Sequence, residues 1–391
     1  MCSSIVYGRP PPTLLTCLPG TAKVEVVDQQ LMARDQKLKA LKVIFLETQN
    51  WMKQVYDKKL KEREFDVGDW GSQSENAFIQ YWEEHIGLPH LPHWLVAKAS
   101  LLSPHHVAVF MKLVEKNELA SNLRSFCKQA NIDCSTNALV KKTTGCTSLP
   151  PVALWNEAKV KYDFPNETPQ SIASQGGLPY FRKSMVKEGS VMPIPDLRDP
   201  MSYKSFLLRS IASKMPFSVA HIEEWKKLFG VEDESNMDEY IQDTLEICEK
   251  SPIQGEKRTC ATSAEDLIDF VVKELGHYAH LWSTESVEGS YENVTIGVVK
   301  LIYGNLSESP ALCHSQSFIF QVYYCHVIQK VRVYAVDIHA RKTVNRAIMA
   351  CHYDTSTWNP NHLAFKLLGL GSGQIEICHW INENGIVWTK T

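Results

Sequence analysis

The C-terminal part of the chain carries apolar residues in short runs that predict β-strands. From Val294 onward, segments rich in aromatic and β-branched residues recur between polar breaks, as is typical of strands. The clearest cover residues 318–324, 331–336, 347–352 and 374–381. We also expect a final hairpin, because the dipeptide Asn384-Gly385 suits a tight turn between antiparallel strands. This region therefore predicts a mainly antiparallel sheet.

Apolar residues at helical spacing predict α-helices ahead of these strands. We expect helices over residues 217–229, 237–250 and 264–275, the last capped by Ser263 and Asp266 and ended by Gly276. Nearer the N-terminus, Ser103-Pro104 predicts the start of a helix, and a second one is expected from about residue 118 to 130,. Helices followed by an antiparallel sheet indicate the α+β class.

The same pattern divides the chain into four parts. Residues 1–75 form a poorly defined N-terminal segment with one amphipathic helix, which we interpret as packing on its own domain. A small helical unit at 76–140 and a proline-containing linker at 141–177 follow,. Residues 178–391 make up the C-terminal domain.

A Cys-His dipeptide occurs four times in the predicted sheet, and a Trp closes the series. The residues are Cys313-His314, Cys325-His326, Cys351-His352, Cys378-His379 and Trp388. Successive side chains on a strand point to opposite faces, so each dipeptide sends its thiol one way and its imidazole the other. Four sulfurs can then meet on one side of a sheet and four imidazoles on the other.

Two interpretations of these dipeptides remain open, and we favour disulfide bonds that back a histidine cluster. Any metal would then be held by nitrogen, and imidazole-rich sites suit copper, zinc or nickel. The alternative is a zinc site built from thiolates and imidazoles, but structural zinc motifs usually space paired ligands by two to four residues. For any one histidine alone, a single hydrogen bond within the sheet is the simpler interpretation.

Composition and charge exclude several classes of protein. A net charge of −3 over 391 residues argues against a dedicated nucleic-acid binder, which needs concentrated Lys and Arg. No apolar run has the length of a membrane-spanning helix,. No pair of carboxylates can be assigned to glycoside hydrolysis. With 44% hydrophobic residues, the chain can bury a sizeable core, and we expect two folded units,.

Cysteines and glycosylation sequons indicate a secreted protein. Eleven cysteines and the sequon asparagines Asn166, Asn293 and Asn305 are typical of an oxidising, glycosylating compartment,. Further disulfide candidates are Cys127 with Cys134 and Cys248 with Cys260, while the connectivity of the four Cys-His cysteines stays open. The first 22 residues lack the pattern of a secretory signal,. Either the natural start precedes this sequence or the protein stays inside the cell, and we favour the first.

Taken together, these features resemble the BURP domain of plant proteins. The four Cys-His pairs, their spacing and Trp388 match the pattern that defines the family, and further agreement lies in residues 178–182, 192–196 and 354–360. The resemblance is strong over residues 178–391 and looser over 76–140. Within the family, the chain most resembles the non-catalytic β subunit of polygalacturonase, although it lacks the aromatic and glycine-rich repeats of the larger subunits.

The resemblance implies three alternative functions. The first is a cell-wall accessory protein of the apoplast that binds polygalacturonase or pectin, modulating pectin breakdown without glycosidase activity of its own. The second is a copper-dependent peptide cyclase that crosslinks Tyr or Trp side chains of a core peptide. The third is a structural protein that responds to stress or development. In the cyclase, His314, His326, His352 and His379 would hold copper, with His362 and Trp388 around them.

Overall fold

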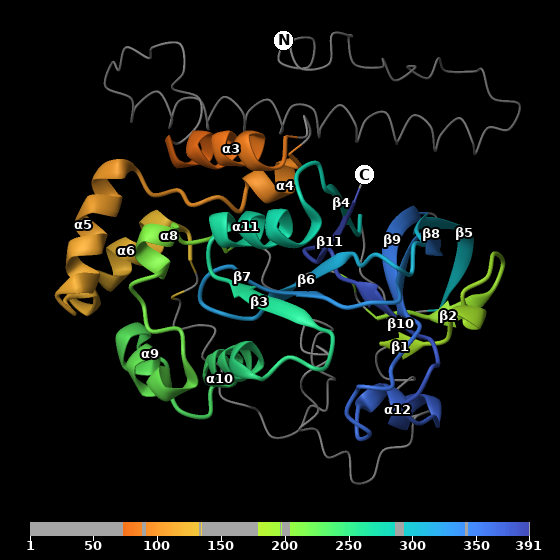
Figure 1. The fold of residues 1–391 in the computed structure, drawn as a ribbon. Helices are drawn as coiled ribbons and strands as arrows, with labels where there is room; N and C mark the ends of the chain where they lie inside the picture. Colours follow the sequence, from red (N-terminus) through yellow and green to blue (C-terminus); the bar gives the residue numbers. More distant parts are fainter. Residues whose placement is uncertain are drawn as a thin grey trace, which may run out of the picture. The chain divides into compact units, whose positions relative to one another are not determined.

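Two antiparallel β-sheets with helices packed around them make up the fold (Figure 1). The computed structural model describes residues 73–390 except 88–90, 133, 135–178, 196, 198–203, 286–292 and 341–342. The predicted N-terminal amphipathic helix, the linker at 141–177 and Asn166 lie outside the described residues. Residues Gly71–Thr391 form one compact unit.

The described helices largely follow the predicted ones. Ser103 accepts a hydrogen bond from the backbone N–H of His106, and Ser263 accepts one from that of Asp266, so both predicted N-caps are present. Gly276 has a φ of 86° directly after the helix that it ends. The α-helices are α3 (Gln73–His85), α4 (His93–Val96), α5 (Pro104–Glu115), α6 (Leu123–Ala130), α8 (Arg209–Ala212), α9 (Ile222–Phe229), α10 (Asn236–Glu249), α11 (Ala264–Leu275) and α12 (Leu363–Leu368). Short 3₁₀ turns are η1 (Leu119–Asn122), η4 (Lys183–Met185) and η5 (Val219–His221).

The strands confirm the α+β class with two separate sheets. The larger sheet has the order β1-β10-β9-β8-β5-β2, and the smaller one has the order β3-β7-β6-β11-β4. Their strands are β1 (Tyr180–Phe181), β2 (Val191–Pro193), β3 (Lys257–Ala261), β4 (His280–Ser283), β5 (Asn293–Tyr303), β6 (Ala311–Gln316), β7 (Val322–Val327), β8 (Val331–Ala340), β9 (Thr343–His352), β10 (Ile377–Ile381) and β11 (Ile386–Thr389).

The predicted final hairpin is wrong. A tight turn is present, because Gly385 N–H donates to the carbonyl oxygen of Asn382 at 2.8 Å. The strands on either side of it do not pair, however: β10 lies between β1 and β9, whereas β11 lies between β6 and β4. The turn therefore carries the chain from one sheet to the other.

The N-terminal helices and the C-terminal sheet share a hydrophobic core. Trp82 of α3 and Trp388 of β11 are both buried, with their ring centroids 5.4 Å apart. Leu267 and Val271 of α11 belong to the same cluster. Figure 1 shows α3 and α11 close together over the smaller sheet. Burial of a Trp at this position is worth roughly 3–5 kcal/mol relative to alanine, so α3 contributes directly to the stability of the sheet region.

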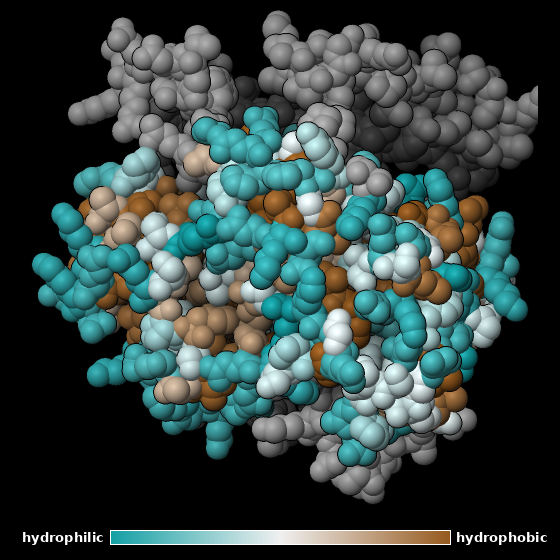
Figure 2. All heavy atoms as spheres, viewed as in Figure 1, coloured by the Kyte–Doolittle hydropathy of each residue, from teal (hydrophilic) through white to brown (hydrophobic). Residues whose placement is uncertain are grey.

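The surface is mainly polar on the face drawn in Figure 2, where hydrophobic residues show between hydrophilic side chains. Val298 and Leu301 of β5 are about half exposed. Scattered apolar residues of this kind are ordinary for a folded protein. Among the described residues, no helix is both long and apolar enough to cross a membrane.

Candidate functional site

Two neighbouring strand pairs bring the cysteines together as disulfide bonds. Cys313 of β6 lies opposite Cys325 of β7, and Cys351 of β9 lies opposite Cys378 of β10. Each pair is disulfide-bonded, which confirms the expected oxidation of the thiols. The sulfurs do not form the single layer that the alternation suggested. The first bond lies in the core of the smaller sheet and the second in that of the larger one, because the two strand pairs belong to different sheets.

The four imidazoles cluster where the two sheets meet, three of them buried and that of His314 partly buried. His314 and His326 come from the smaller sheet, and His352 and His379 from the larger one. Neighbouring ring centroids are 5.4–6.3 Å apart around the cluster. The Nε2 atoms of His352 and His379 are 3.3 Å apart, and at most 7% of His326, His352 or His379 is exposed. The predicted histidine cluster is thus assembled by tertiary contact between sheets.

Glu256 holds one of these imidazoles from outside the cluster. Its Oε1 accepts a hydrogen bond from the Tyr324 hydroxyl at 2.9 Å and lies 3.2 Å from His326 Nδ1, while Oε2 accepts from the backbone N–H of Ile253 at 3.0 Å. Burial raises the pKa of Glu256, but the contact with His326 and the hydrogen bonds from Ile253 and Tyr324 outweigh it and lower the pKa overall. An ionised Glu256 favours the His326 tautomer with hydrogen on Nδ1, which leaves the lone pair on Nε2.

Sequence reasoning did not identify Glu256 as a site residue. Glu256 directly precedes β3, next to Gly255, in a stretch without a recognisable motif. Its contact with His326 depends on the pairing of β3 with β7, in which Arg258 lies opposite His326. The only signal in the sequence was a lone acidic residue beside a glycine.

Aromatic side chains separate His362 from the four clustered imidazoles. The Trp358 ring centroid is 4.7 Å from that of His362 and 5.2 Å from that of His352. Tyr180 lies 5.3 Å from His362 and 6.4 Å from His379 by the same measure. His362 Nδ1 accepts from the backbone N–H of Ala364 at 3.1 Å and so caps α12. The structure thus places His362 beside the cluster as a helix cap.

Trp388 lies on the other side of the smaller sheet. It packs in the core with Cys313 and Ala311, and its register partner is Ala311. Because His314 follows Cys313 directly in β6, its imidazole points to the opposite face,. Trp388 therefore supports the disulfide side of the sheet, whereas the sequence placed it around the histidines.

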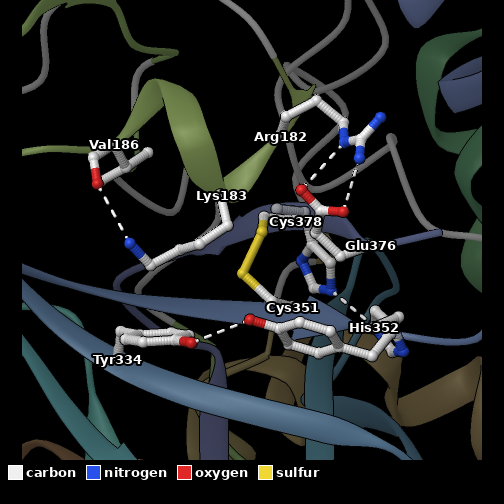
Figure 3. The surroundings of a disulfide bond; sticks show 10 residues. Arg182, Lys183, Val186, Tyr334, Cys351, His352, Glu376 and Cys378 are labelled. Atoms are coloured by element: carbon white, nitrogen blue, oxygen red, sulfur yellow. Dashed lines mark hydrogen bonds and ion pairs between the residues drawn. A yellow bond between two sulfur atoms is a disulfide. The ribbon is translucent and has the colours of Figure 1, made fainter.

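Polar side chains surround the disulfide bond between Cys351 and Cys378 (Figure 3). Arg182 donates from Nε and Nη2 to the two carboxylate oxygens of Glu376, at 3.0 and 2.6 Å. The hydrogen bonds from Arg182 lower the pKa of Glu376. Nearby, burial and the Tyr353 hydroxyl, 3.0 Å away, raise the pKa of Tyr334 to about 12. The ion pair thus ties Arg182, which lies between β1 and η4, to Glu376, which directly precedes β10.

The remaining disulfide candidates pair as their spacing predicted. Cys127 is bonded to Cys134 at the end of α6, and Cys248 is bonded to Cys260. The second bond ties α10 to β3.

Two of the sequon asparagines fall within the described residues. Asn293 and Asn305 are both exposed, as a glycosylation acceptor must be,. The Asn305 side-chain oxygen accepts hydrogen bonds from the backbone N–H and hydroxyl of Ser307. Both residues remain candidate acceptors.

The imidazole nitrogens of the histidine cluster are suitable ligands for a metal ion, but they are not arranged as a complete metal site. Within the described ranges, no three His, Cys, Asp or Glu side chains have the arrangement of a metal site. The 3.3 Å between the Nε2 atoms of His352 and His379 nevertheless matches a tetrahedron edge of about 3.3–3.4 Å around an ion with bonds of ~2.0–2.1 Å,. The same distance suits a hydrogen bond between the two rings.

A family model for the BURP domain matches residues 179–390, which contain every described strand. The chain belongs to the BURP-domain family. It is 45% identical over 212 residues to Polygalacturonase-1 non-catalytic subunit beta of Solanum lycopersicum, and 46% identical to Polygalacturonase 1 beta-like protein 1 of Arabidopsis thaliana. Each match covers 54% of this chain and only 34% of the relative.

A further BURP relative matches more of the chain. BURP domain-containing protein 16 of Oryza sativa subsp. japonica is 33% identical over 317 residues, which is 79% of this chain and 88% of that protein. This match extends beyond the 212 residues of the BURP model. That extent agrees with the structure, in which α3 shares a core with the BURP strands.

Proposed function

We propose that this BURP protein is an extracellular cell-wall accessory protein that associates with a polygalacturonase. The observation that carries the proposal is the 45% identity with a polygalacturonase non-catalytic subunit over 212 residues. A match of that extent corresponds to the region that builds both sheets. Because the chain covers only a third of that relative, the proposed partner is assigned to the BURP region.

The covalent chemistry of the chain supports an extracellular location. Disulfide bonds persist in oxidising compartments, and four are present in the described part of the chain. The exposed Asn293 and Asn305 are open to glycosylation,.

The test is direct binding between the full chain and a purified plant polygalacturonase. The chain is immobilised under oxidising conditions and titrated with the enzyme, and an unrelated cell-wall enzyme of similar charge serves as the control. We expect saturable binding that is lost when the disulfide bonds are reduced. Failure to bind at about 10 μM enzyme, which corresponds to a free energy weaker than about −7 kcal/mol, would contradict the proposal.

The histidine cluster favours a second candidate function, a copper-dependent peptide cyclase. The specific observation is the meeting of four imidazoles from two sheets, with two Nε2 atoms 3.3 Å apart. His314, His326, His352 and His379 would hold the ion, and copper would supply one-electron and oxygen chemistry. The Glu256 carboxylate, 3.2 Å from His326 Nδ1, would favour a hydrogen on that nitrogen and so keep the Nε2 lone pair available,.

Copper binding and peptide crosslinking can be tested separately. The metal content of the full chain is measured after incubation with copper(II) and desalting, next to a variant in which all four histidines are alanine. Tryptic mass spectrometry then seeks a loss of paired hydrogens in a peptide that contains Tyr or Trp. Binding without a mass change supports a metal site alone. Equal copper content in the two proteins removes the basis of this second candidate.

A further inference from the structure

Strand β4 forms an open edge of the smaller sheet. It pairs with β11 and, among the described strands, with no other (Figure 1). An edge strand leaves the backbone N–H and C=O groups of every second residue without a partner from a neighbouring strand, and these groups can bind another strand. Lysine, proline or a bulge commonly protects such an edge. The strand β4 contains neither lysine nor proline, and its pairs with β11 follow one another without a register shift.

The pairing pattern identifies Leu281 and Ser283 as the residues whose backbone groups point outward. The Cα atoms of Cys313 and Cys325 are 4.0 Å apart, which is typical of a pair without hydrogen bonds between its two strands,. Cys313 therefore directs its N–H and C=O toward β11, where Ile386 lies opposite it. Ile386 in turn directs its own groups toward β6 and away from Ser283 of β4,. Ser283, and Leu281 two residues earlier, thus direct their N–H and C=O groups toward the open edge.

A cavity of about 750 Å³ runs along this edge. Every residue from 281 to 285 lines it. Because successive side chains of a strand point to opposite faces, a cavity that touches each of them in turn lies beside the backbone edge and not over one face. Residues of β5, β8 and β9 in the larger sheet form another wall. The outward backbone groups of β4 therefore face a space of the size that ligand pockets usually have.

The larger sheet already uses the next outward position along the same edge. The Glu285 N–H donates to the carbonyl oxygen of Arg346 in β9 at 2.8 Å, and the Arg346 N–H donates to that of Glu285 at 3.3 Å. The Thr284 hydroxyl donates to the carbonyl oxygen of Ile381 and accepts from the Ile348 N–H at 3.0 Å. These bonds fix the end of β4 to the larger sheet, so the edge loses little conformational entropy when it binds a further segment.

The walls of the cavity favour apolar and positively charged side chains. Trp94 and Trp282 are only partly buried, and the Trp282 indole Nε1 donates to the Thr389 hydroxyl oxygen at 2.9 Å. The apolar lining residues are Leu281, Val298, Ile302, Ala335 and Ile348. The charged ones are Glu285, Lys300, Asp337, Arg346 and Glu383. Asp337 and Arg346 form an ion pair at 3.4 Å, which leaves two carboxylates and one ammonium group. A basic side chain is attracted by these carboxylates and by the indole faces.

We propose that the open edge of β4 binds an extended peptide segment of a partner protein, which adds to the five-stranded smaller sheet as a sixth strand,. The outward backbone groups of Leu281 and Ser283 form its hydrogen bonds. Its apolar side chains pack against the two indoles of the cavity, and its basic side chains lie near Glu285 and Glu383. The segment therefore alternates apolar and basic residues along β4. This inference goes beyond the proposed function, because it assigns a surface and the chemistry of its ligand, whichever protein carries the segment.

The test is titration of the full chain, kept oxidised, with a short peptide of alternating valine and lysine that is acetylated and amidated. Calorimetry gives the affinity, and hydrogen exchange of the backbone amides locates the peptide. The amide hydrogens of Leu281 and Ser283 should exchange rapidly in the free chain and about tenfold more slowly, or less, in the complex. The matched peptide of alternating valine and glutamate should bind about tenfold more weakly, because the carboxylates of the cavity repel it.

Changes in the peptide and in the chain test the strand pairing itself. N-methylation of every second amide of the valine-lysine peptide should weaken binding about tenfold for one of the two alternating sets, because only that set donates to β4. Ser283→Pro removes one outward N–H and should weaken binding about fivefold. Glu383→Gln should weaken it about threefold, whereas Glu188→Gln, at an exposed position outside the cavity, should leave it unchanged. Circular dichroism and thermal unfolding establish that each variant is folded.

Four results would overturn the strand site. They are slow exchange of the Leu281 and Ser283 amides in the free chain, absence of peptide binding, equal binding of the lysine and glutamate peptides, and unchanged binding by folded Ser283→Pro or by both N-methylated peptides. Slow exchange that appears only at high protein concentration would show that a second copy of the chain occupies the edge, and it would also overturn the proposal. Capture of polygalacturonase is measured separately, so the proposed function stands or falls on its own result.

Discussion

Replacing Glu256 with alanine should destabilise the protein more than any single contact of that side chain would suggest. The carboxylate accepts hydrogen bonds from Tyr324 and Ile253 and contacts His326 Nδ1, and its side chain is only 6% exposed. A buried donor that loses its acceptor costs about 1–3 kcal/mol. With up to three donors affected, we expect Glu256→Ala to lower the free energy of unfolding by roughly 4 kcal/mol. Glu256→Gln keeps one acceptor oxygen and should cost about half as much.

The assay is urea unfolding followed by far-UV circular dichroism. With a denaturant slope of about 3 kcal/mol/M, the Glu256→Ala midpoint should fall by more than ~1 M. Glu308→Ala is the matched control, because Glu308 accepts one hydrogen bond from the Tyr303 hydroxyl at 3.2 Å and is 42% exposed. Because Glu308 is so exposed, Glu308→Ala should lower the free energy of unfolding by only about 0.5–1 kcal/mol.

A second measurement isolates the effect on His326. Side-chain ¹⁵N NMR of the metal-free wild type should show His326 with hydrogen on Nδ1, because the Glu256 carboxylate lies 3.2 Å from that nitrogen and favours a proton there,. Glu256→Gln should shift the tautomer distribution, whereas Glu308→Ala should leave it unchanged. If Glu256→Ala costs no more stability than Glu308→Ala and leaves the His326 spectrum unchanged, Glu256 does not position the imidazole.

Three further changes test the core, an ion pair and a disulfide bond. Trp82→Ala should cost about 3–5 kcal/mol in a single unfolding transition,; a separate transition for the helices would contradict the shared core. Glu376→Gln removes the ion pair with Arg182, at a cost of about 1 kcal/mol at pH 7. Because the folded pKa of Glu376 is lowered, this stabilisation is present above the unfolded pKa of about 4.3 and is lost as pH falls. The free energy of unfolding should therefore change less between pH 7 and pH 3 in the variant than in the wild type. The same pH dependence in both proteins would refute this explanation. Replacing Cys351 and Cys378 with alanine opens a loop with a sequence separation of 27 and should cost about 3.5 kcal/mol, and a loss below 1 kcal/mol in the same urea assay would show that loop closure contributes little.

Local chemistry in the sequence determined the helix ends and the direction of the Cys-His side chains. The Ser263 cap and Gly276 are sufficient to bound α11, because each acts within one turn of the helix,. The opposite directions of thiol and imidazole follow from the two-residue period of a strand, so a disulfide side and a histidine side were predictable. The short spacings between Cys127 and Cys134 and between Cys248 and Cys260 likewise predicted their pairing.

Only the tertiary structure decided which strands pair and what surrounds the histidines. The final turn looks like a hairpin in sequence, yet β10 and β11 join different sheets. A strand pairs where its side chains are best buried, and the strands that offer this burial can lie far away in the sequence. Glu256 and His326 are 70 positions apart and meet only through the pairing of β3 with β7. The four imidazoles converge for the same reason. The sequence determines on which face of its strand each imidazole lies, but only the packing of the two sheets determines which side chains it contacts there.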